Sequence, residues 1–382
     1  MKVLQFGRFW NDQHGGIERH VALLSRELAS QGVTVTNLVA ADHQKGSDTR
    51  VDGYRLVQAP SYGRAFSTAI SPALISKALS LHRDNQFDLI HLHLPDPLSH
   101  ATSLLFPSDV KRVITWHSDI IKQKRLLAVY SPLVRRLLNK ADAVVAGTSA
   151  HYSSSNQIPE SVPASRRHVI PYGLDFTSME LNPQTTLLLE QIKLRAAGKP
   201  IVLALGRHVY YKGFDVLIDA MRHIDALLII GSDGPLRPDL EAQVARDQLQ
   251  EKVWFTGRIP ENELAAYLNA CDLFCLPSVE QSEAFGLVQL EAMACGKPVV
   301  NTQLFNGVNV VNVDGVTGLT VPVRDSVALA EAINRLLGDD ALRQQLGRQA
   351  RERALQEYSL KAMGEKHVAL YRSLLEQGNT AN

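Results

Sequence analysis

The stretch that decides the fold runs from residue 283 to residue 300 and reads Glu283-Ala284-Phe285-Gly286-Leu287-Val288-Gln289-Leu290-Glu291-Ala292-Met293-Ala294-Cys295-Gly296-Lys297-Pro298-Val299-Val300. Its middle predicts a helix over 285–294, and the apolar residues on either side predict strands, so the stretch belongs to an alternating α/β domain. One carboxylate, Glu283, precedes the helix, and eight helical steps bring Glu291 to the same general side.

The start of this predicted helix suits a pyrophosphate. The N–H groups of Phe285, Gly286 and Leu287 would point outward at the positive end of the helix dipole, and a glycine lets a ligand approach closely. Ionised Glu283 and Glu291 only accept hydrogen bonds, so both can receive sugar or ribose hydroxyls. For any such pair taken alone, two ordinary exposed glutamates are the alternative interpretation.

Outward from this stretch, strands and helices alternate along the whole chain, which is typical of parallel α/β layers. Strands are predicted at 2–6, 33–39, 89–93, 113–116, 143–146, 169–170, 201–205, 226–230, 253–256, 273–276 and 298–301. Helices are predicted at 17–31, 214–223, 285–294, 326–337, 340–358 and 360–375. A Pro-Tyr-Gly hinge at 171–173 separates two doubly wound domains, which we expect to face each other across a cleft. Ligands of such sheets bind beyond the carboxyl ends of the strands.

Two cations follow the first strand of the second half. Leu205-Gly206-Arg207 ends that strand and Lys212-Gly213 comes five residues later. Arg207 can fork across two phosphate oxygens while Lys212 acts as a point charge, so together they can neutralise a departing diphosphate. Taken alone, both would be surface charges.

Three polar positions mark the first half. Gly15 and Gly16 open the first helix, where a tight loop brings amides close to a ligand, although a plain turn is the alternative. His117 ends a strand within Trp116-His117-Ser118-Asp119 and can orient a hydroxyl, or merely cap the loop. His91 and His93 alternate along 89–94, and we expect them to point to opposite faces of the sheet, so that only one can readily serve the cleft.

Together these motifs resemble the signature of retaining glycosyltransferase family four, which has the GT-B fold of two Rossmann-like domains. The stretch 283–300 carries the resemblance most strongly, and it agrees with the Arg207 and Lys212 pair and with Phe255-Thr256-Gly257-Arg258-Ile259. The resemblance covers nearly the whole chain. One departure is the run Asn301-Thr302-Gln303-Leu304-Phe305-Asn306-Gly307-Val308, where many relatives carry a small-Gly-Gly turn and a glutamate.

The resemblance implies a role for each motif. Glu283 would hold the transferred sugar and Glu291 the ribose, while the loop at Arg258 and Ile259 would receive the base. Gly15 and Gly16 would border the donor phosphate, and His117 would lie close to the donor sugar. It implies an acceptor domain over 1–170, a donor domain over 171–358, and a helix over 359–382 that packs back on the first domain. It implies no metal, no cofactor beyond the nucleotide sugar and no protein base, since the leaving phosphate takes the acceptor's proton.

More narrowly, the run from His117 to Lys124 looks like that of bacterial O-antigen mannosyl- and rhamnosyltransferases that use GDP-sugars. The expected donor is therefore GDP-mannose or GDP-rhamnose, and the expected acceptor is a lipid-linked glycan of a polysaccharide or O-antigen. The alternatives are a transferase that uses a UDP-sugar, a UDP-N-acetylglucosamine epimerase of the same fold, and a non-catalytic assembly scaffold. The missing G-x-G-x-x-G disfavours a dehydrogenase.

Charge is distributed unevenly along the chain. The net charge is +1, yet residues 1–170 hold 20 Lys and Arg against 13 Asp and Glu, a charge of +7. The excess lies between Asp119 and Asp142, where six cations alternate with apolar residues and no acid intervenes: Lys122, Lys124, Arg125, Arg135, Arg136 and Lys140. Such a segment is typical of a helix on anionic lipid, of the acceptor surface, or of a solvated helix face over a core. No aromatic-basic pattern suggests nucleic acid.

The rest of the composition is ordinary. Apolar residues make up 45% and charged residues 21%, so each half can bury a core, and no run approaches the roughly 20 apolar residues of a membrane span. The first residues lack a signal-peptide h-region, so we expect a cytoplasmic protein, with a peripheral position on the cytoplasmic face of the inner membrane as the alternative. Cys271 and Cys275 are interpreted as small core residues rather than metal ligands.

Overall fold

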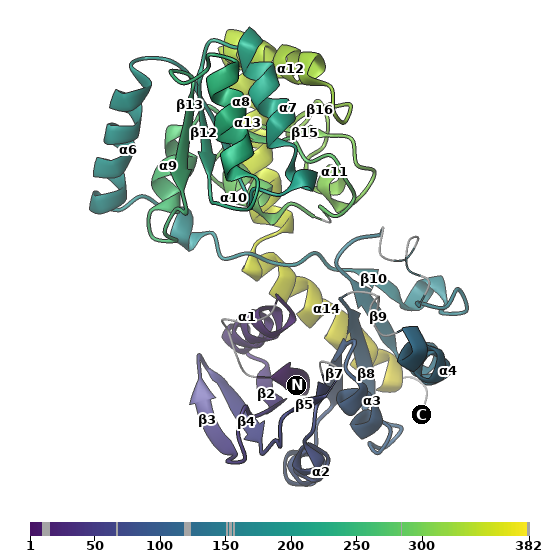
Figure 1. Ribbon diagram of the computed structural model, residues 1–382. Helices are drawn as coiled ribbons and strands as arrows, with labels where there is room; N and C mark the ends of the chain where they lie inside the picture. Colours follow the sequence, from purple (N-terminus) through teal and green to yellow (C-terminus); the bar gives the residue numbers. More distant parts are fainter. Residues whose placement is uncertain are drawn as a thin grey trace. The chain divides into compact units, whose positions relative to one another are not determined.

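The computed structural model of the chain describes residues 1–9, 16–65, 68–117, 124–149, 152, 155, 157–283 and 285–379 (Figure 1). These residues form two compact units. Unit 1 comprises Met1–Gly173 and Leu360–Asn382, and unit 2 comprises Leu174–Ser359. The boundary expected at 170/171 therefore falls three residues before the division of the structure, and the C-terminal helix belongs to unit 1.

Unit 1 is built on one eight-stranded sheet with the strand order β10-β9-β8-β7-β1-β2-β4-β3. Its strands are β1 (Lys2–Phe9), β2 (Thr34–Ala40), β3 (Ser47–Val51), β4 (Tyr54–Ala59), β7 (Leu89–Leu94), β8 (Lys111–Trp116), β9 (Ala143–Ala146) and β10 (Arg167–Val169). A separate ribbon pairs β5 (Arg64–Ala65) with β6 (Thr68–Ala69). Its helices are α1 (Gly16–Ser30), α2 (Pro72–Asn85), α3 (Pro97–Ser103), α4 (Lys124–Lys140) and α14 (Leu360–Asn379). The sheet is parallel except where β3 pairs with β4.

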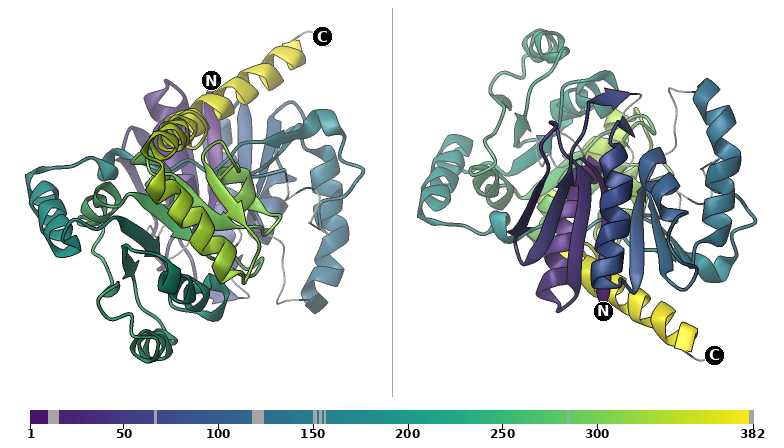
Figure 2. Two further views of the ribbon diagram at one scale, coloured as in Figure 1. Left: turned by 90° about the horizontal axis from the view of Figure 1, so that it is seen from above. Right: turned by 90° about the horizontal axis from the view of Figure 1, so that it is seen from below.

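Both faces of this sheet are buried, because successive strand residues point to opposite sides. Leu4 and Phe6 pack with α2 and α4 on one face, whereas Val3 packs with α1 and α14 on the other. In the two views of Figure 2 the yellow helix α14 runs across the strands of unit 1. The C-terminal helix thus closes a core that begins with the first strand of the chain.

The hairpin of β3 and β4 was not predicted. Its turn is Asp52-Gly53, and both residues take positive φ, 45° and 86°, as a two-residue hairpin loop requires. The Asp-Gly pair was the available signal. The strands escaped notice because β3 has no buried residue and so no apolar pattern.

Unit 2 is built on a six-stranded parallel sheet with the order β13-β12-β11-β14-β15-β16. Its strands are β11 (Ile201–Leu205), β12 (Leu227–Gly231), β13 (Val253–Gly257), β14 (Leu273–Leu276), β15 (Val299–Thr302) and β16 (Gly318–Val321). Its helices are α6 (Pro183–Ala196), α7 (Phe214–Ala220), α8 (Arg237–Arg246), α9 (Leu264–Ala270), α10 (Leu287–Ala294), α11 (Gly307–Val311), α12 (Ser326–Gly338) and α13 (Asp340–Glu357). The 3-10 turns are η1 (Ala164–Arg166) in unit 1 and η2 (Thr177–Met179), η3 (Tyr210–Lys212) and η4 (Met221–His223) in unit 2.

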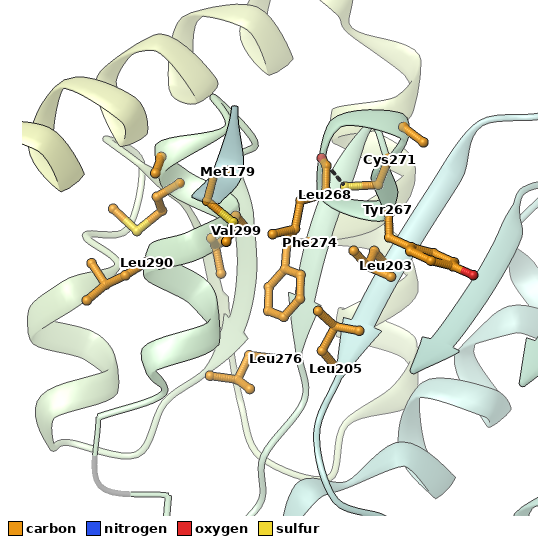
Figure 3. Close-up of a cluster of buried hydrophobic side chains, with 14 of the residues drawn as sticks. Met179, Leu203, Leu205, Tyr267, Leu268, Cys271, Phe274, Leu276, Leu290 and Val299 are labelled. Atoms are coloured by element: carbon orange, nitrogen blue, oxygen red, sulfur yellow. Dashed lines mark hydrogen bonds between the residues drawn. The ribbon is translucent and has the colours of Figure 1, made fainter. Parts of the chain in front are cut away.

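Two apolar clusters sandwich this sheet. Figure 3 shows one of them, in which Phe274 of β14 lies near Leu205 and Leu276. Cys271 belongs to this cluster and donates its thiol to the Leu268 carbonyl at 3.3 Å, whereas Cys275 belongs to the cluster on the opposite face. Both cysteines are buried and free, so their interpretation as core residues is confirmed. No helix in the described part of the chain is long and apolar enough to cross a bilayer.

Candidate active site

The centre of the unit 2 site is a buried ion pair. Nζ of Lys212 lies 2.5 Å from Oε2 of Glu283, and the two side chains are only 9% and 11% exposed. Ser278 donates its hydroxyl to the same carboxylate oxygen at 3.1 Å. Lys212 follows β11 and Glu283 follows β14, and these strands are neighbours in the sheet. The pair therefore lies at the carboxyl edge of the sheet, where ligands of such folds bind.

The backbone holds Lys212 in place. The Tyr211 carbonyl accepts the N–H of Val279 at 2.8 Å, which ties turn η3 to the loop after β14. The next residue, Gly213, has φ +66°, and a Cβ there would meet the Pro277 carbonyl oxygen at 2.1 Å. Only glycine fits this contact, and the close approach is what brings the Lys212 ammonium to Glu283.

The backbone around Glu283 is anchored as well. Asn306 donates its side-chain amide to the Glu283 carbonyl at 2.7 Å and also caps α11 by accepting from the N–H of Val308. Thr302 donates its hydroxyl to the Ser278 carbonyl. Asn306 and Thr302 lie in the segment where the sequence departs from many relatives, and here that segment supports the loop that carries Glu283.

The predicted start of the helix after Glu283 is wrong by two residues. Helix α10 begins at Leu287, because Gly286 takes a left-handed φ of +64° and forms the N-cap. A Cβ on Gly286 would meet Leu276 Cδ2 at 2.6 Å, so the turn requires glycine. Phe285 therefore precedes the helix and packs half-buried against the core, while Leu287 is 44% exposed. Glu291 lies on α10 and is half-buried.

The remaining donor-side residues follow two strand ends at the same edge, those of β11 and β13, which are separated by β12. Arg207 comes after β11 and is exposed, and Arg258 comes after β13 and is exposed. Ile259 is half-buried and packs against the core cluster. The N–H of Gly206 donates to the Gly231 carbonyl, and the N–H of Ser232 donates to the Gly257 carbonyl. These bonds connect the ends of β11, β12 and β13. The edge thus presents two exposed cations beside the buried pair.

Unit 1 holds a second polar group, a chain of buried hydrogen bonds that begins at His117. Tyr172 Oη lies 3.2 Å from Nδ1 of His117, and Nε2 of His117 lies 3.0 Å from Nδ1 of His93. Nε2 of His93 lies 2.8 Å from Oε1 of Gln5, whose amide nitrogen donates to Tyr371 Oη at 3.3 Å. From Tyr371 the chain runs to His91 Nδ1 at 2.6 Å and ends where His91 Nε2 meets the Thr115 hydroxyl at 2.7 Å.

The Gln5 amide gives this chain a direction. Its oxygen can only accept, so Nε2 of His93 carries a proton and Nδ1 of His93 accepts. His117 must then donate through Nε2 and accept the Tyr172 proton at Nδ1. Burial lowers the pKa of His93 and of His91 well below the ordinary value, so both rings are neutral at physiological pH.

His20 of α1 completes the cluster. Its Nε2 is buried and has no hydrogen-bond partner, and burial lowers its pKa well below the ordinary value. One ligand nitrogen from each of His20, His93 and His117 lies within 4.8 Å of the others, so the three rings could hold a metal ion. A metal there would have to displace the proton shared by His93 and His117.

Two family models match the chain in succession. Residues 14–178 match the model described as Glycosyltransferase Family 4, and residues 188–353 match the model described as Glycosyl transferases group 1. D-rhamnosyltransferase WbpZ of Pseudomonas aeruginosa is 30% identical over 354 residues, which cover 92% of this chain and 91% of that protein.

The chain belongs to glycosyltransferase family 4. O-antigen chain mannosyltransferase C of Escherichia coli is 29% identical over 380 residues, covering 98% of this chain and 99% of that one. Among solved structures, sucrose-phosphate synthase from Thermosynechococcus elongatus superposes with a TM-score of 0.71 at 25% identity, covering 98% and 99% of the two chains. The GT-B fold predicted from the sequence is confirmed, and this glycosyltransferase takes a nucleotide-sugar donor and a glycan acceptor.

Several predicted site residues of the glycosyltransferase lie outside the described part of the structure: Gly15, Asp119 and Lys122. Gly16 begins α1, and Lys124 and Arg125 lie in the first turn of α4. Arg135 and Arg136 are exposed on the second half of α4. The basic segment is thus a helix with a buried face that includes Val134 and Leu137.

The sequence analysis missed most of the hydrogen-bonded chain. The prediction that His91 and His93 point to opposite faces of the sheet is wrong, because residues two apart on a strand share a face. Their ring centroids are 4.3 Å apart, and each ring joins the same chain. A signal was present, since Gln5, His91 and His93 are polar residues within strands that otherwise read as buried.

Proposed function

We propose that this glycosyltransferase transfers a mannose or rhamnose residue from a GDP-sugar to a lipid-linked glycan of a bacterial polysaccharide, with retention of anomeric configuration. The observation that carries the proposal is the match to O-antigen chain mannosyltransferase C over 98% of this chain and 99% of that one. The D-rhamnosyltransferase at 30% identity supports the same class of sugar.

In the proposed reaction the bond between the sugar's C1 and the diphosphate oxygen breaks, and the electron pair leaves with the diphosphate. Lys212 and Arg207 neutralise that charge, while Glu283 and Glu291 accept hydroxyl hydrogen bonds from the sugar and the ribose. The acceptor oxygen bonds to C1 on the same face, and its proton passes to the leaving phosphate. His117 would orient a sugar hydroxyl by accepting its proton at Nδ1, in place of the Tyr172 hydroxyl.

We infer that transfer requires no divalent metal, because two cations already stand at the sheet edge to offset the diphosphate. The Lys212 ammonium is 9% exposed, so its charge acts in a medium of low dielectric constant and is screened little. Transfer rates should therefore be unchanged by EDTA. A rate that falls with EDTA and returns with Mg²⁺ would contradict this inference.

The test combines donor binding with product analysis. Thermal unfolding is measured with GDP, UDP, ADP and NAD, where a ligand at a hundred times its dissociation constant stabilises by about 2.7 kcal/mol. GDP-mannose and GDP-rhamnose are then offered with a lipid-linked glycan, and the anomeric configuration of the product is read by NMR. A shift with UDP alone would discard the proposed donor but keep the transferase. Release of free N-acetylmannosamine from a UDP-sugar would favour the epimerase.

Matched variants tie the activity to the ion pair. Glu283→Gln keeps the size of the side chain but removes its charge, so we expect transfer to fall at least a hundredfold. Lys199→Met is the control, because Lys199 is an exposed lysine paired with Asp225 away from the site. If Glu283→Gln kept full transfer activity, the ion pair would have no catalytic role, and a parent protein that transfers sugar from none of the donors would favour the scaffold.

We further propose that the protein works at the cytoplasmic face of a membrane, where a lipid-linked acceptor would present its glycan. The support is helix α4, whose exposed positions include Leu133, Arg135 and Arg136. Cationic and apolar side chains that alternate on one helix are typical of contact with anionic lipid.

A further inference from the structure

Unit 1 contains a cavity of about 800 Å³ beside α4, apart from the histidine chain. Residues of α4 form one wall, the segment after α3 forms another, and Arg112 of β8 and Arg166 of η1 complete it. Figure 1 shows α4 next to β9 and β10 at this edge of the sheet. The apolar lining residues are Leu104, Phe106, Leu133 and Leu137, and the cations are Arg112, Arg136, Lys140 and Arg166.

The cavity cations have no acidic partner in the lining. No carboxylate lines the cavity among the residues that the structure describes. Arg112 donates to the carbonyls of Val110, Phe106 and Pro107, and Arg166 donates to those of Asn139 and Ala141. These carbonyl oxygens fix the guanidinium groups without neutralising them. His100, also in the lining, is neutral because burial lowers its pKa to about 4.

Four of the five α4 residues in the lining form one helical stripe, and the fifth is Asn139. Leu133, Arg136, Leu137 and Lys140 are spaced i, i+3, i+4 and i+7, which places them on one face. Arg135, by contrast, is exposed on the same turn but does not line the cavity. Of these two neighbouring arginines of equal charge, Arg136 therefore lines the cavity and Arg135 lies outside it.

Apolar side chains are exposed at the same place. Leu104 is 57% exposed and Leu133 is 51% exposed, and they stand on opposite walls. A soluble anion such as inorganic phosphate would use the cations and leave these leucines in water. A ligand with both a phosphate and hydrocarbon would use both sets, since burying apolar area is favourable by about 25 cal/mol per Å².

We propose that this cavity binds the phosphate group of an anionic membrane phospholipid, with the acyl chains over Leu104 and Leu133. The inference deepens the proposed function, because it rests on the membrane contact suggested there and assigns that contact to one lipid site. Bound lipid would hold unit 1 on the bilayer through one phospholipid molecule rather than through a diffuse basic surface.

The experiment is co-sedimentation of the full-length protein with vesicles of phosphatidylcholine, alone or mixed with phosphatidylglycerol. We expect binding to the mixed vesicles only. A cation near an anionic surface contributes about 1 kcal/mol, so Arg136→Gln and Lys140→Gln should each weaken binding about fivefold. The matched control Arg135→Gln should change binding by no more than about twofold. Leu133→Ser should weaken binding, whereas Leu105→Ser, at an exposed leucine outside the cavity lining, should not.

Competition separates the lipid from a free anion. Dihexanoyl phosphatidylglycerol, which is soluble as single molecules, should release the protein from vesicles, and inorganic phosphate at the same concentration should not. Equal losses with Arg135→Gln and Arg136→Gln, or equal competition by inorganic phosphate, would overturn the lipid site. Nucleotide-induced stabilisation is measured on every variant. If it persists while vesicle binding fails, this inference falls and the proposed function stands.

Discussion

Nε2 of His117 lies 3.0 Å from Nδ1 of His93, and this contact decides which nitrogen of His117 carries a proton. His93 can accept only because its other nitrogen donates to Gln5, which in turn donates to Tyr371 of the C-terminal helix. The tautomer of His117 is therefore set by a hydrogen-bonded chain that joins Gln5 of β1 to Tyr371 of α14, two residues that lie 366 positions apart in the sequence.

Replacing His93 should reduce turnover more than donor binding. His93→Leu deprives the His117 Nε2–H of its acceptor, so the ring is free to rotate or change tautomer, and we expect kcat to fall about tenfold or more. Nucleotide-induced stabilisation should stay unchanged, because the ion pair of unit 2 is untouched. His367→Leu, at another buried histidine of unit 1, is the control. Equal losses of kcat in both variants would argue against a positioning role.

Removing one partner of the buried ion pair should destabilise the protein more than removing both. Lys212→Met leaves the Glu283 carboxylate buried without its cation, at a cost of about 3–5 kcal/mol in the free energy of unfolding. Adding Glu283→Gln should recover most of that loss, because no unpaired charge remains. Urea unfolding of the two single variants and the double variant measures the coupling. Additive losses would mean that the pair does not interact energetically.

Gly213→Ala should be far more costly than Gly198→Ala. Both glycines have positive φ, +66° and +83°, so both substitutions carry the backbone strain of about 1 kcal/mol. Only at Gly213 would the new Cβ meet a backbone oxygen, that of Pro277 at 2.1 Å. We expect a loss above about 3 kcal/mol there, together with lost donor binding, since the turn positions Lys212. Thermal unfolding with and without nucleotide would reveal both effects, and equal stability of the two variants would contradict the steric argument.

Stability should fall as pH falls below 6.5. Burial lowers the pKa of His367 to about 4, and it lowers those of His20, His91 and His93 as well. Below 6.5 the unfolded chain binds protons that the folded protein excludes, so each such histidine removes about 1.4 kcal/mol of stability per pH unit until its folded pKa is reached. The stability they contribute is complete above the unfolded pKa.

The variant His367→Leu isolates one of these contributions. Nε2 of His367 is buried without a partner, so leucine should be tolerated at pH 7. Its free energy of unfolding, measured in urea from pH 7 to pH 5, should depend less steeply on pH than that of the parent protein. An unchanged slope would show that His367 titrates at its ordinary pKa in the folded state.

The fold was predictable from the sequence where local signals were strong. Buried strands such as β11 and β14 were placed correctly within a residue, because parallel strands covered on both faces read as continuous apolar runs. The start of α10 was misplaced, since an acidic residue and a glycine looked like a helix N-terminus while Gly286 in fact takes a left-handed conformation. Helices α2, α3, α6, α8, α9 and α11 were not predicted, because they are short or only partly amphipathic.

In the candidate sites, too, residues within contiguous motifs were predictable and residues that depend on distant contacts were not. Lys212 and Glu283 were found because each lies in a motif of contiguous residues. Asn306, which holds the Glu283 backbone, depends on a contact between loops that follow different strands, whereas Ser278 lies in the same loop as Glu283. The chain from His117 to Tyr371 joins β1, β7, β8 and α14, and no local pattern reveals such a contact. What the sequence did not disclose is the support of the site rather than its charged groups.

The pairing of Lys212 with Glu283 also makes the protein a discriminating receptor. In the absence of donor, each charge satisfies the other, so an anion that draws the ammonium away leaves a buried carboxylate with Ser278 as its remaining hydrogen-bond partner. Inorganic phosphate or a bare nucleotide can compensate one half of the pair but offers no sugar hydroxyls to the other. In the proposed function, a complete nucleotide sugar would satisfy both halves of the pair in one event. Opening the ion pair would thus require a ligand that offers both a negative charge to Lys212 and hydroxyls to Glu283. Abundant cellular anions that offer only the charge would leave the pair closed.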